Sequence, residues 1–202
     1  MSEANNAILL RGTLAEKPVY SHSVREERFY RMLLSVRRLS GTEDLLPVLV
    51  RERLLRAAEP GEADMLCVQG ELRSFNNRSG VGAKLVLSVF ARELRFEEGE
   101  DDNRVSLSGL LCRLPNLRQT PLGREVCDLM LAVPRRTGRA DYLPCICWGH
   151  LARKAALLSV GAALKLEGRL QSRVYLKQTE AGPERRTAYE VSVSEWESAV
   201  QE

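Results

Sequence analysis

The chain carries an internal repeat with a period of about 97 residues, and this repeat limits what the chain can fold into. Residues 6–12, which run from an Asn to a Gly, match residues 103–109. Residues 68–74 match residues 166–172 at an offset of 98, so the order of the motifs is kept with one residue of drift. A unit of this length can bury its own core, unlike a single solenoid repeat. The sequence therefore predicts two small domains of one architecture.

An acidic stretch separates the two copies. Five of residues 97–102 are Asp or Glu, in a chain whose formal net charge is +3. Residues 103–202 contain 15 Lys or Arg against 10 Asp or Glu, whereas residues 1–102 contain 15 against 17. Because like charges repel, we predict a solvated linker at 97–102 between a first domain at 1–96 and a second at 103–202. The stretch lacks the alternating ligand positions of a calcium loop, so a metal site is the weaker interpretation.

Composition excludes several classes of protein. The chain has 202 residues, 44% of them hydrophobic, which is typical of a globular protein. No apolar run approaches the roughly 20 residues that a membrane span needs. The first residues lack the basic and apolar regions of a signal peptide, so we expect a cytoplasmic protein. The five cysteines are an odd number without CxxC spacing, which argues against a disulfide framework and a zinc ribbon.

Short β-rich runs, separated by turn signals, make up each copy. In the second copy a polar loop at 115–123 follows the first run, and residues 151–158 change to helical spacing before Gly161. Three strands, a helix and two strands follow the order of an OB-fold barrel. We therefore predict an all-β protein with two tandem five-stranded OB-fold barrels, each with one short helix between strands 3 and 4. The strands predicted in the second copy are 104–111, 126–133, 142–148, 162–170 and 187–193.

Two aromatic residues of the second copy, Tyr142 and Trp148, lie six positions apart in its third predicted strand. Six is an even number, so both side chains leave the same face of the sheet. Leu143, Cys145 and Cys147 then lie on the opposite face, which suits a barrel interior. Taken alone, the two rings fit either packing in a core or interface, or a surface on which nucleic-acid bases stack.

The second copy closely resembles the bacterial single-stranded DNA-binding protein family. The similar segments occur in the order of that family and cover nearly all of residues 103–197. The first copy resembles the same family more faintly, and primosomal replication protein is a close cousin. The resemblance implies a non-enzymatic, sequence-tolerant binder of single-stranded DNA in replication, recombination or repair. The segments are 103–109, 115–123, 131–133, 141–149 and 167–173.

The resemblance places Tyr142, Trp148 and Tyr175 at positions that the family uses for base stacking. In the first copy Leu45 and Arg51 replace the first two, so we expect this copy to have lost most of its stacking platform. Candidate phosphate contacts of the second copy are Arg135, Arg136, Arg139, Arg169, Arg173, Lys177, Arg185 and Arg186. Those of the first copy are Arg37, Arg38, Arg51 and Arg73.

The resemblance also bears on partners. Family members usually gather four barrels, which implies a homodimer of this two-barrel chain, located in the cytoplasm and associated with the nucleoid. The chain stops soon after its last predicted strand, so we do not expect the acidic recruiting tail of replicative members. Replication or repair proteins are further expected partners, and no cofactor, metal or catalytic group is predicted. Two alternatives stay open: an OB-fold interaction module of a primosome or mobile-element complex with weak DNA contact, and an RNA binder.

Overall fold

The computed structural model describes residues 4–77, 85–179 and 182–198. Two compact units divide the chain. The N-terminal unit consists of Ala7–Arg73 and Leu87–Arg104. The C-terminal unit consists of Met1–Asn6, Ser74–Val86 and Val105–Glu202, so it takes in short pieces of the first repeat. The boundaries at 96 and 103 that the sequence suggested stay a prediction.

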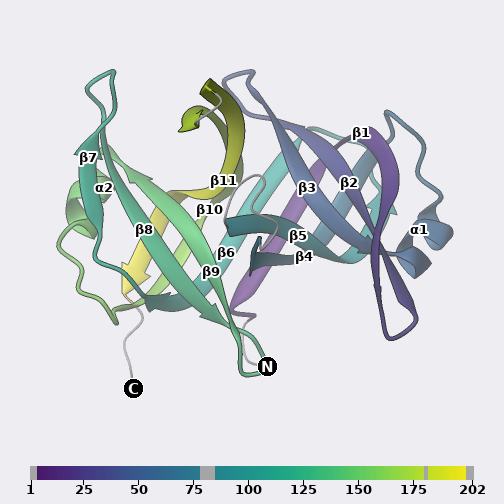
Figure 1. The fold of residues 1–202 in the computed structure, drawn as a ribbon, viewed down its shortest axis with the longest axis horizontal. Coiled ribbons are helices and arrows are strands. Elements are labelled where there is room, and N and C mark those ends of the chain that lie inside the picture. The colour runs from purple at the N-terminus through teal and green to yellow at the C-terminus, as the bar shows by residue number, and fades with distance from the viewer. Residues whose placement is uncertain (1–3, 78–84, 180–181, 199–202) are drawn as a thin grey trace. The chain divides into compact units, whose positions relative to one another are not determined.

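The first repeat forms a closed barrel of five strands (Figure 1). The neighbour order is β2-β3-β5-β4-β1, and a pairing between β1 and β2 closes the ring. Strands β3 and β5 run parallel, whereas β1 pairs antiparallel with both β2 and β4. The helix α1 lies between β3 and β4 in the chain. The elements are β1 Asn6–Val24, β2 Glu27–Arg37, β3 Glu43–Arg51, α1 Glu52–Ala58, β4 Met65–Asn76 and β5 Leu85–Phe96.

The second repeat forms a barrel with the same connections. Its neighbour order is β6-β10-β11-β9-β8-β7, and a pairing between β6 and β8 closes it. Strands β9 and β11 run parallel, and α2 lies between β9 and β10. The elements are β6 Asp102–Leu111, β7 Asn116–Gln119, β8 Glu125–Pro134, β9 Ala140–Trp148, α2 Gly149–Ala155, β10 Ala163–Thr179 and β11 Gly182–Ser198.

These connections confirm the prediction of two tandem OB-fold barrels, each with a short helix between its third and fourth strands. Three details differ from the prediction. The short strand β7 was expected to be a loop, α2 is shorter than the predicted helix, and β10 and β11 extend into a long hairpin. Among the described residues, no helix has both the length and the apolar character that a membrane span requires.

The core of each barrel comes from alternate residues of its strands. In β3, Leu46, Val48 and Val50 are fully buried, and they lie on one face because side chains alternate along a strand. The matched glycines of the repeat, Gly12 and Gly109, have a steric role. A Cβ atom at either position would meet the backbone carbonyl oxygen of a neighbouring strand. The repeat therefore preserves the residues that let these strands approach closely.

The acidic stretch between β5 and β6 is held by arginines. The Glu97 carboxylate lies 2.6 Å from Arg11 Nη1 and 2.8 Å from Arg95 Nη2. Arg11 Nε also donates to the backbone carbonyl of Glu100 at 2.6 Å. Hydrogen bonds from Arg11 and Arg95 lower the pKa of Glu97. Neighbouring cations therefore offset the negative charge at Glu97, and the assignment of 97–102 as a solvated linker stays a prediction.

Candidate nucleic-acid interface

Two aromatic rings reach solvent from the outer face of β9. Tyr142 is 50% exposed and Trp148 is 37% exposed, whereas Leu143, Cys145 and Cys147 between them are buried. At about 3.3 Å per residue, six residues of strand separate the two aromatic positions by roughly 20 Å. The exposure rules out the interpretation of these two residues as core of the chain. Their rings are therefore accessible from solvent at two separate places on this face.

The β10–β11 hairpin carries a third ring among charged groups. Tyr175 lies opposite Arg186 in the strand register, and Lys177 lies opposite Glu184. The Arg173 guanidinium is 5.6 Å from the centre of the Tyr175 ring, within the range of a cation–π interaction. Arg186 pairs with Glu184 at 2.7 Å, which raises the pKa of Arg186. This face of the hairpin thus places an aromatic ring beside several cations.

The other face of the same hairpin is more apolar. Arg185 lies there opposite Leu176, which is 68% exposed, and Val174 is also exposed. Because side chains alternate along a strand, Arg185 and Arg186 point to opposite faces. The two neighbouring arginines therefore do not serve one continuous surface.

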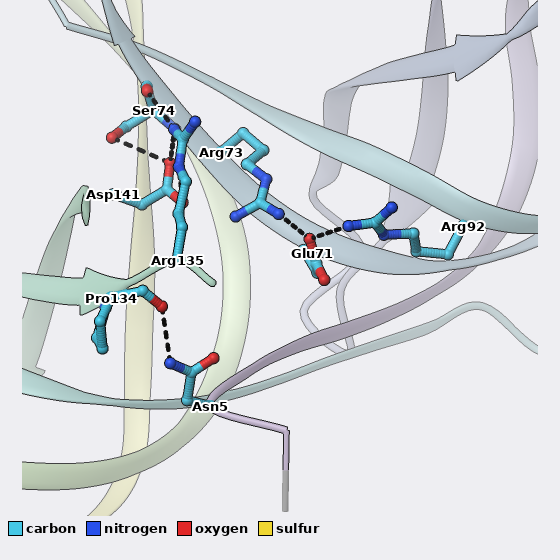
Figure 2. A network of polar contacts seen from close by, with 8 residues as sticks. All are labelled: Asn5, Glu71, Arg73, Ser74, Arg92, Pro134, Arg135 and Asp141. Carbon is cyan, nitrogen blue, oxygen red and sulfur yellow. Dashed lines mark hydrogen bonds and ion pairs between the residues drawn. The ribbon is translucent and has the colours of Figure 1, made fainter. Parts of the chain in front are cut away.

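Arg135, a predicted phosphate contact, is bound to a buried carboxylate. Its guanidinium donates to both oxygens of Asp141, with Nε at 2.7 Å from Oδ2, and to the Ser74 carbonyl oxygen at 3.1 Å (Figure 2). The same pair recurs 97 residues earlier, where Arg38 holds the buried Asp44 through two hydrogen bonds of 2.7 Å. These bidentate pairs give both arginines a role within the fold. Their contact with phosphate stays a prediction.

Other cations of the C-terminal unit lack the ion pairs that Arg135 and Arg186 form. Arg136 and Arg139 are exposed in the loop that joins β8 to β9. Within the part of the chain that the structure describes, five of the predicted cations have no carboxylate at ion-pair distance. They are Arg136, Arg139, Arg169, Lys177 and Arg185.

In the N-terminal barrel, the position that matches Trp148 is occupied by a cation, Arg51. Arg51, which matches Trp148 in the repeat, lies with its guanidinium 4.8 Å from the Phe90 ring centre and 5.9 Å from that of Phe29. The His22 ring stacks on Phe29 at a centroid distance of 5.0 Å. The sequence did not single out Phe90, because its role depends on strands β2, β3 and β5 coming together. The aromatic rings of this face are thus already occupied by side chains of the barrel.

Predicted cations of the N-terminal barrel have acidic neighbours. Arg37 pairs with Glu43 at 3.1 Å. Arg73 pairs with Glu71, which also binds Arg92 at 2.9 Å (Figure 2). Neighbouring carboxylates weaken the attraction of a guanidinium for phosphate, so these arginines are poorer candidates than the unpaired ones.

The thiols of β9 are buried in the second barrel. Burial raises the pKa of Cys147 to about 12 and also raises that of Cys145, as expected for the barrel interior in which the sequence placed them. No group of three or more His, Cys, Asp or Glu side chains in the described ranges could hold a metal ion.

The fold and the exposed rings define the chain as a tandem OB-fold protein with a candidate nucleic-acid surface on its second barrel. Residues 102–199 match the sequence profile of the Single-strand binding protein family. The second half of the chain is therefore similar to the Single-strand binding protein family.

Individual relatives show the same similarity. The chain is similar to single-stranded DNA-binding protein 2 of Listeria innocua, with 39% identity over 36% of this chain and 50% of the relative. It is 40% identical to single-stranded DNA-binding protein A of Bacillus subtilis over 38% of this chain and 48% of the relative. The chain thus spans about half the length of these relatives. The wild-type single-stranded DNA binding protein of Thermus aquaticus has a similar structure, with 25% identity, a TM-score of 0.79, and coverage of 98% of this chain and 94% of that one.

Proposed function

We propose that the chain binds single-stranded DNA without reading its sequence. Bases would stack on Tyr142, Trp148 and Tyr175, and nearby cations would contact the phosphates. The observation that carries the proposal is the exposure of Tyr142 and Trp148 on one face of the otherwise buried strand β9. The names of the Listeria, Bacillus and Thermus relatives support the same ligand.

The unpaired cations supply the electrostatic part of this proposal. Phosphate neutralisation releases counterions and makes binding depend on salt. The cations come from the β8–β9 loop and from the β10–β11 hairpin, the elements that carry or border the aromatic residues. They are Arg136, Arg139, Arg169, Lys177 and Arg185, of which Arg185 lies on the hairpin face opposite to Tyr175 and would contact a DNA strand that also covers that face.

The proposed role is that of a non-enzymatic binder in bacterial replication, recombination or repair, acting at the nucleoid. The relationship of the chain to primosomal replication protein stays a prediction. The N-terminal barrel would serve chiefly as the partner of the second barrel, because its outer aromatic face is filled by Arg51 and His22. Two such chains would bring together four barrels.

A fluorescence titration of the full chain with oligo-dT at two salt concentrations tests the proposal. We expect quenching of Trp148 emission, weaker binding at the higher salt, and similar affinity for oligonucleotides of mixed sequence. A preference for RNA of the same length would favour the RNA-binding alternative. Absence of binding at low salt would refute the proposal and favour a protein-interaction module.

A further inference from the structure

A short piece of the first repeat belongs to the same compact unit as the second barrel. Residues 74–77, at the end of β4 and just beyond it, are the described part of this piece before β5. We propose that this segment is part of the single-stranded DNA site of the second barrel, and that Phe75 supplies a further base-stacking ring near Tyr142. The inference rests on the proposed function and extends its site to a residue outside the second repeat.

Ser74 is fixed to β9 by hydrogen bonds (Figure 2). Its backbone N–H donates to Oδ1 of Asp141 at 2.6 Å, and its Oγ accepts from the backbone N–H of Tyr142 at 2.7 Å. Its carbonyl oxygen accepts from Arg135 Nη2 at 3.1 Å. Ser74 and Asp141 are both buried, and hydrogen bonds to an ionised group are the stronger kind. The backbone at position 74 is therefore held next to the stacking residue Tyr142.

Phe75 follows directly on this fixed position. It is 49% exposed, close to the 50% of Tyr142, so a base can reach both rings. Ser74 is buried and Phe75 is exposed, as expected for successive residues of a strand. A ring on a backbone that is already ordered loses little conformational freedom when a base stacks on it. Tyr142 and Phe75 thus offer two accessible rings, and the hydrogen bond from Tyr142 N–H to Ser74 Oγ links the backbone segments that carry them.

The internal repeat shows that this position differs between the copies. At an offset of 98, Ser74 and Phe75 correspond to Ser172 and Arg173. The serine is kept, whereas the next residue is Arg173 beside Tyr175 in one copy and an exposed phenylalanine in the other. At this matched position the first repeat therefore carries an aromatic ring and the second repeat carries a cation.

Substitution of Phe75 in the full chain tests the inference, with Phe96 as the matched control because it is 52% exposed at the end of β5. Binding of a labelled oligo-dT is followed by fluorescence anisotropy at low salt. Phe75→Ala should weaken binding about 5-fold or more, which is the lower end of the loss for one stacked base. Phe75→Leu keeps an apolar side chain but lacks a flat ring, so we expect a similar loss. Phe96→Ala should bind within about twofold of the unchanged chain, since no base is expected to stack there.

Photo-crosslinking to an oligonucleotide that contains iodouracil gives a direct readout in the unchanged protein. We expect adducts at Phe75 as well as at Tyr142. Binding of Phe75→Leu within twofold of the unchanged chain, or adducts at Tyr142 without any at Phe75, would overturn this inference and leave the proposed function intact. If the unchanged chain failed to bind oligo-dT, the proposed function would fail and this inference with it. Circular dichroism checks the fold of each variant, and the crosslink decides the matter if Phe75→Ala does not fold.

Discussion

At the scale of single residues, solvent exposure decides what an aromatic substitution changes. Tyr142 and Trp148 point away from the core, so the removal of either ring should lower the affinity for DNA more than the stability of the fold. We expect Tyr142→Ala and Trp148→Ala each to weaken oligo-dT binding by ~1–3 kcal/mol, the range for base–aromatic stacking. Anisotropy of a labelled oligonucleotide measures this loss. Tyr142→Phe keeps the ring and should retain most of the affinity, and a collapsed circular dichroism spectrum in Trp148→Ala would contradict the surface assignment.

Burial also distinguishes two arginine–aspartate pairs that have the same bidentate hydrogen bonding. Arg135–Asp141 has a fully buried carboxylate, whereas in Arg118–Asp128 the two side chains are 40% and 38% exposed. Removing one partner of a buried pair leaves an uncompensated charge. Asp141→Ala should therefore lower the free energy of unfolding by about 3–5 kcal/mol.

The matched variant Asp128→Ala should cost less than ~1 kcal/mol, because water screens its pair. Urea unfolding followed by tryptophan emission reports on the C-terminal unit, which contains both tryptophans of the chain. Equal losses in the two variants would show that burial does not set the strength of these pairs.

Sequence reasoning at this scale succeeded where strand parity alone decides the outcome. The even spacing of Tyr142 and Trp148 predicted their common exposed face. Sequence reasoning did not find the pairing of Arg135 with Asp141 and Ser74, because these residues come together only in the folded chain. The contact of Arg135 with phosphate stays a prediction. A signal was nevertheless present in the repeat, since Arg38 and Asp44 precede Arg135 and Asp141 by the same 97 residues.

At the scale of elements, the β8–β9 loop and the β10–β11 hairpin should set the salt dependence. If the five unpaired cations each neutralise one phosphate, a plot of log K against log salt should have a slope of roughly −3.5, from ~0.7 per contact on single strands. Arg136→Ala combined with Arg139→Ala should flatten this slope by about 1.4. Anisotropy titrations between low and moderate salt measure it.

Arg113→Ala combined with Arg124→Ala removes the same charge from exposed positions outside the proposed site, so the slope should stay within error of the unchanged chain. Arg135 is left out of the double variant, because its removal would leave the buried Asp141 carboxylate without its guanidinium partner. An unchanged slope in Arg136→Ala with Arg139→Ala would remove this loop from the phosphate-binding surface.

Hydrophobic alternation located most strands, and it failed where a strand lacks a buried face. All four residues of β7 are exposed, so the segment has no period that could distinguish it from a loop. The outer part of β10 is mostly exposed on both faces, so the hydrophobic pattern could not predict the length of the hairpin. Pairing with a neighbouring strand, rather than burial of side chains, defines these elements.

At the scale of the whole molecule, the two copies should contribute unequally to DNA binding. The N-terminal barrel offers Arg37 and Arg73, whose charges are offset by Glu43 and Glu71. We expect Arg37→Ala combined with Arg73→Ala to cost less affinity than Trp148→Ala alone, since surface ion pairs and stacking differ in strength. Titrations at one salt concentration compare the variants directly. A larger loss from the arginine pair would assign the main contact to the N-terminal barrel.

The same argument leads to a prediction about assembly. Covalent linkage raises the effective concentration of one barrel beside the other, so each chain can act as a permanent pair of barrels. Because the single-stranded DNA-binding family usually gathers four barrels, we expect two chains to associate as a homodimer. Light scattering on the eluting protein should give about twice the mass of one chain at micromolar concentration. A monomer mass over the same range would defeat this prediction, while the effects of Tyr142→Ala and Trp148→Ala on binding would still test the site, because their exposed rings lie within one unit.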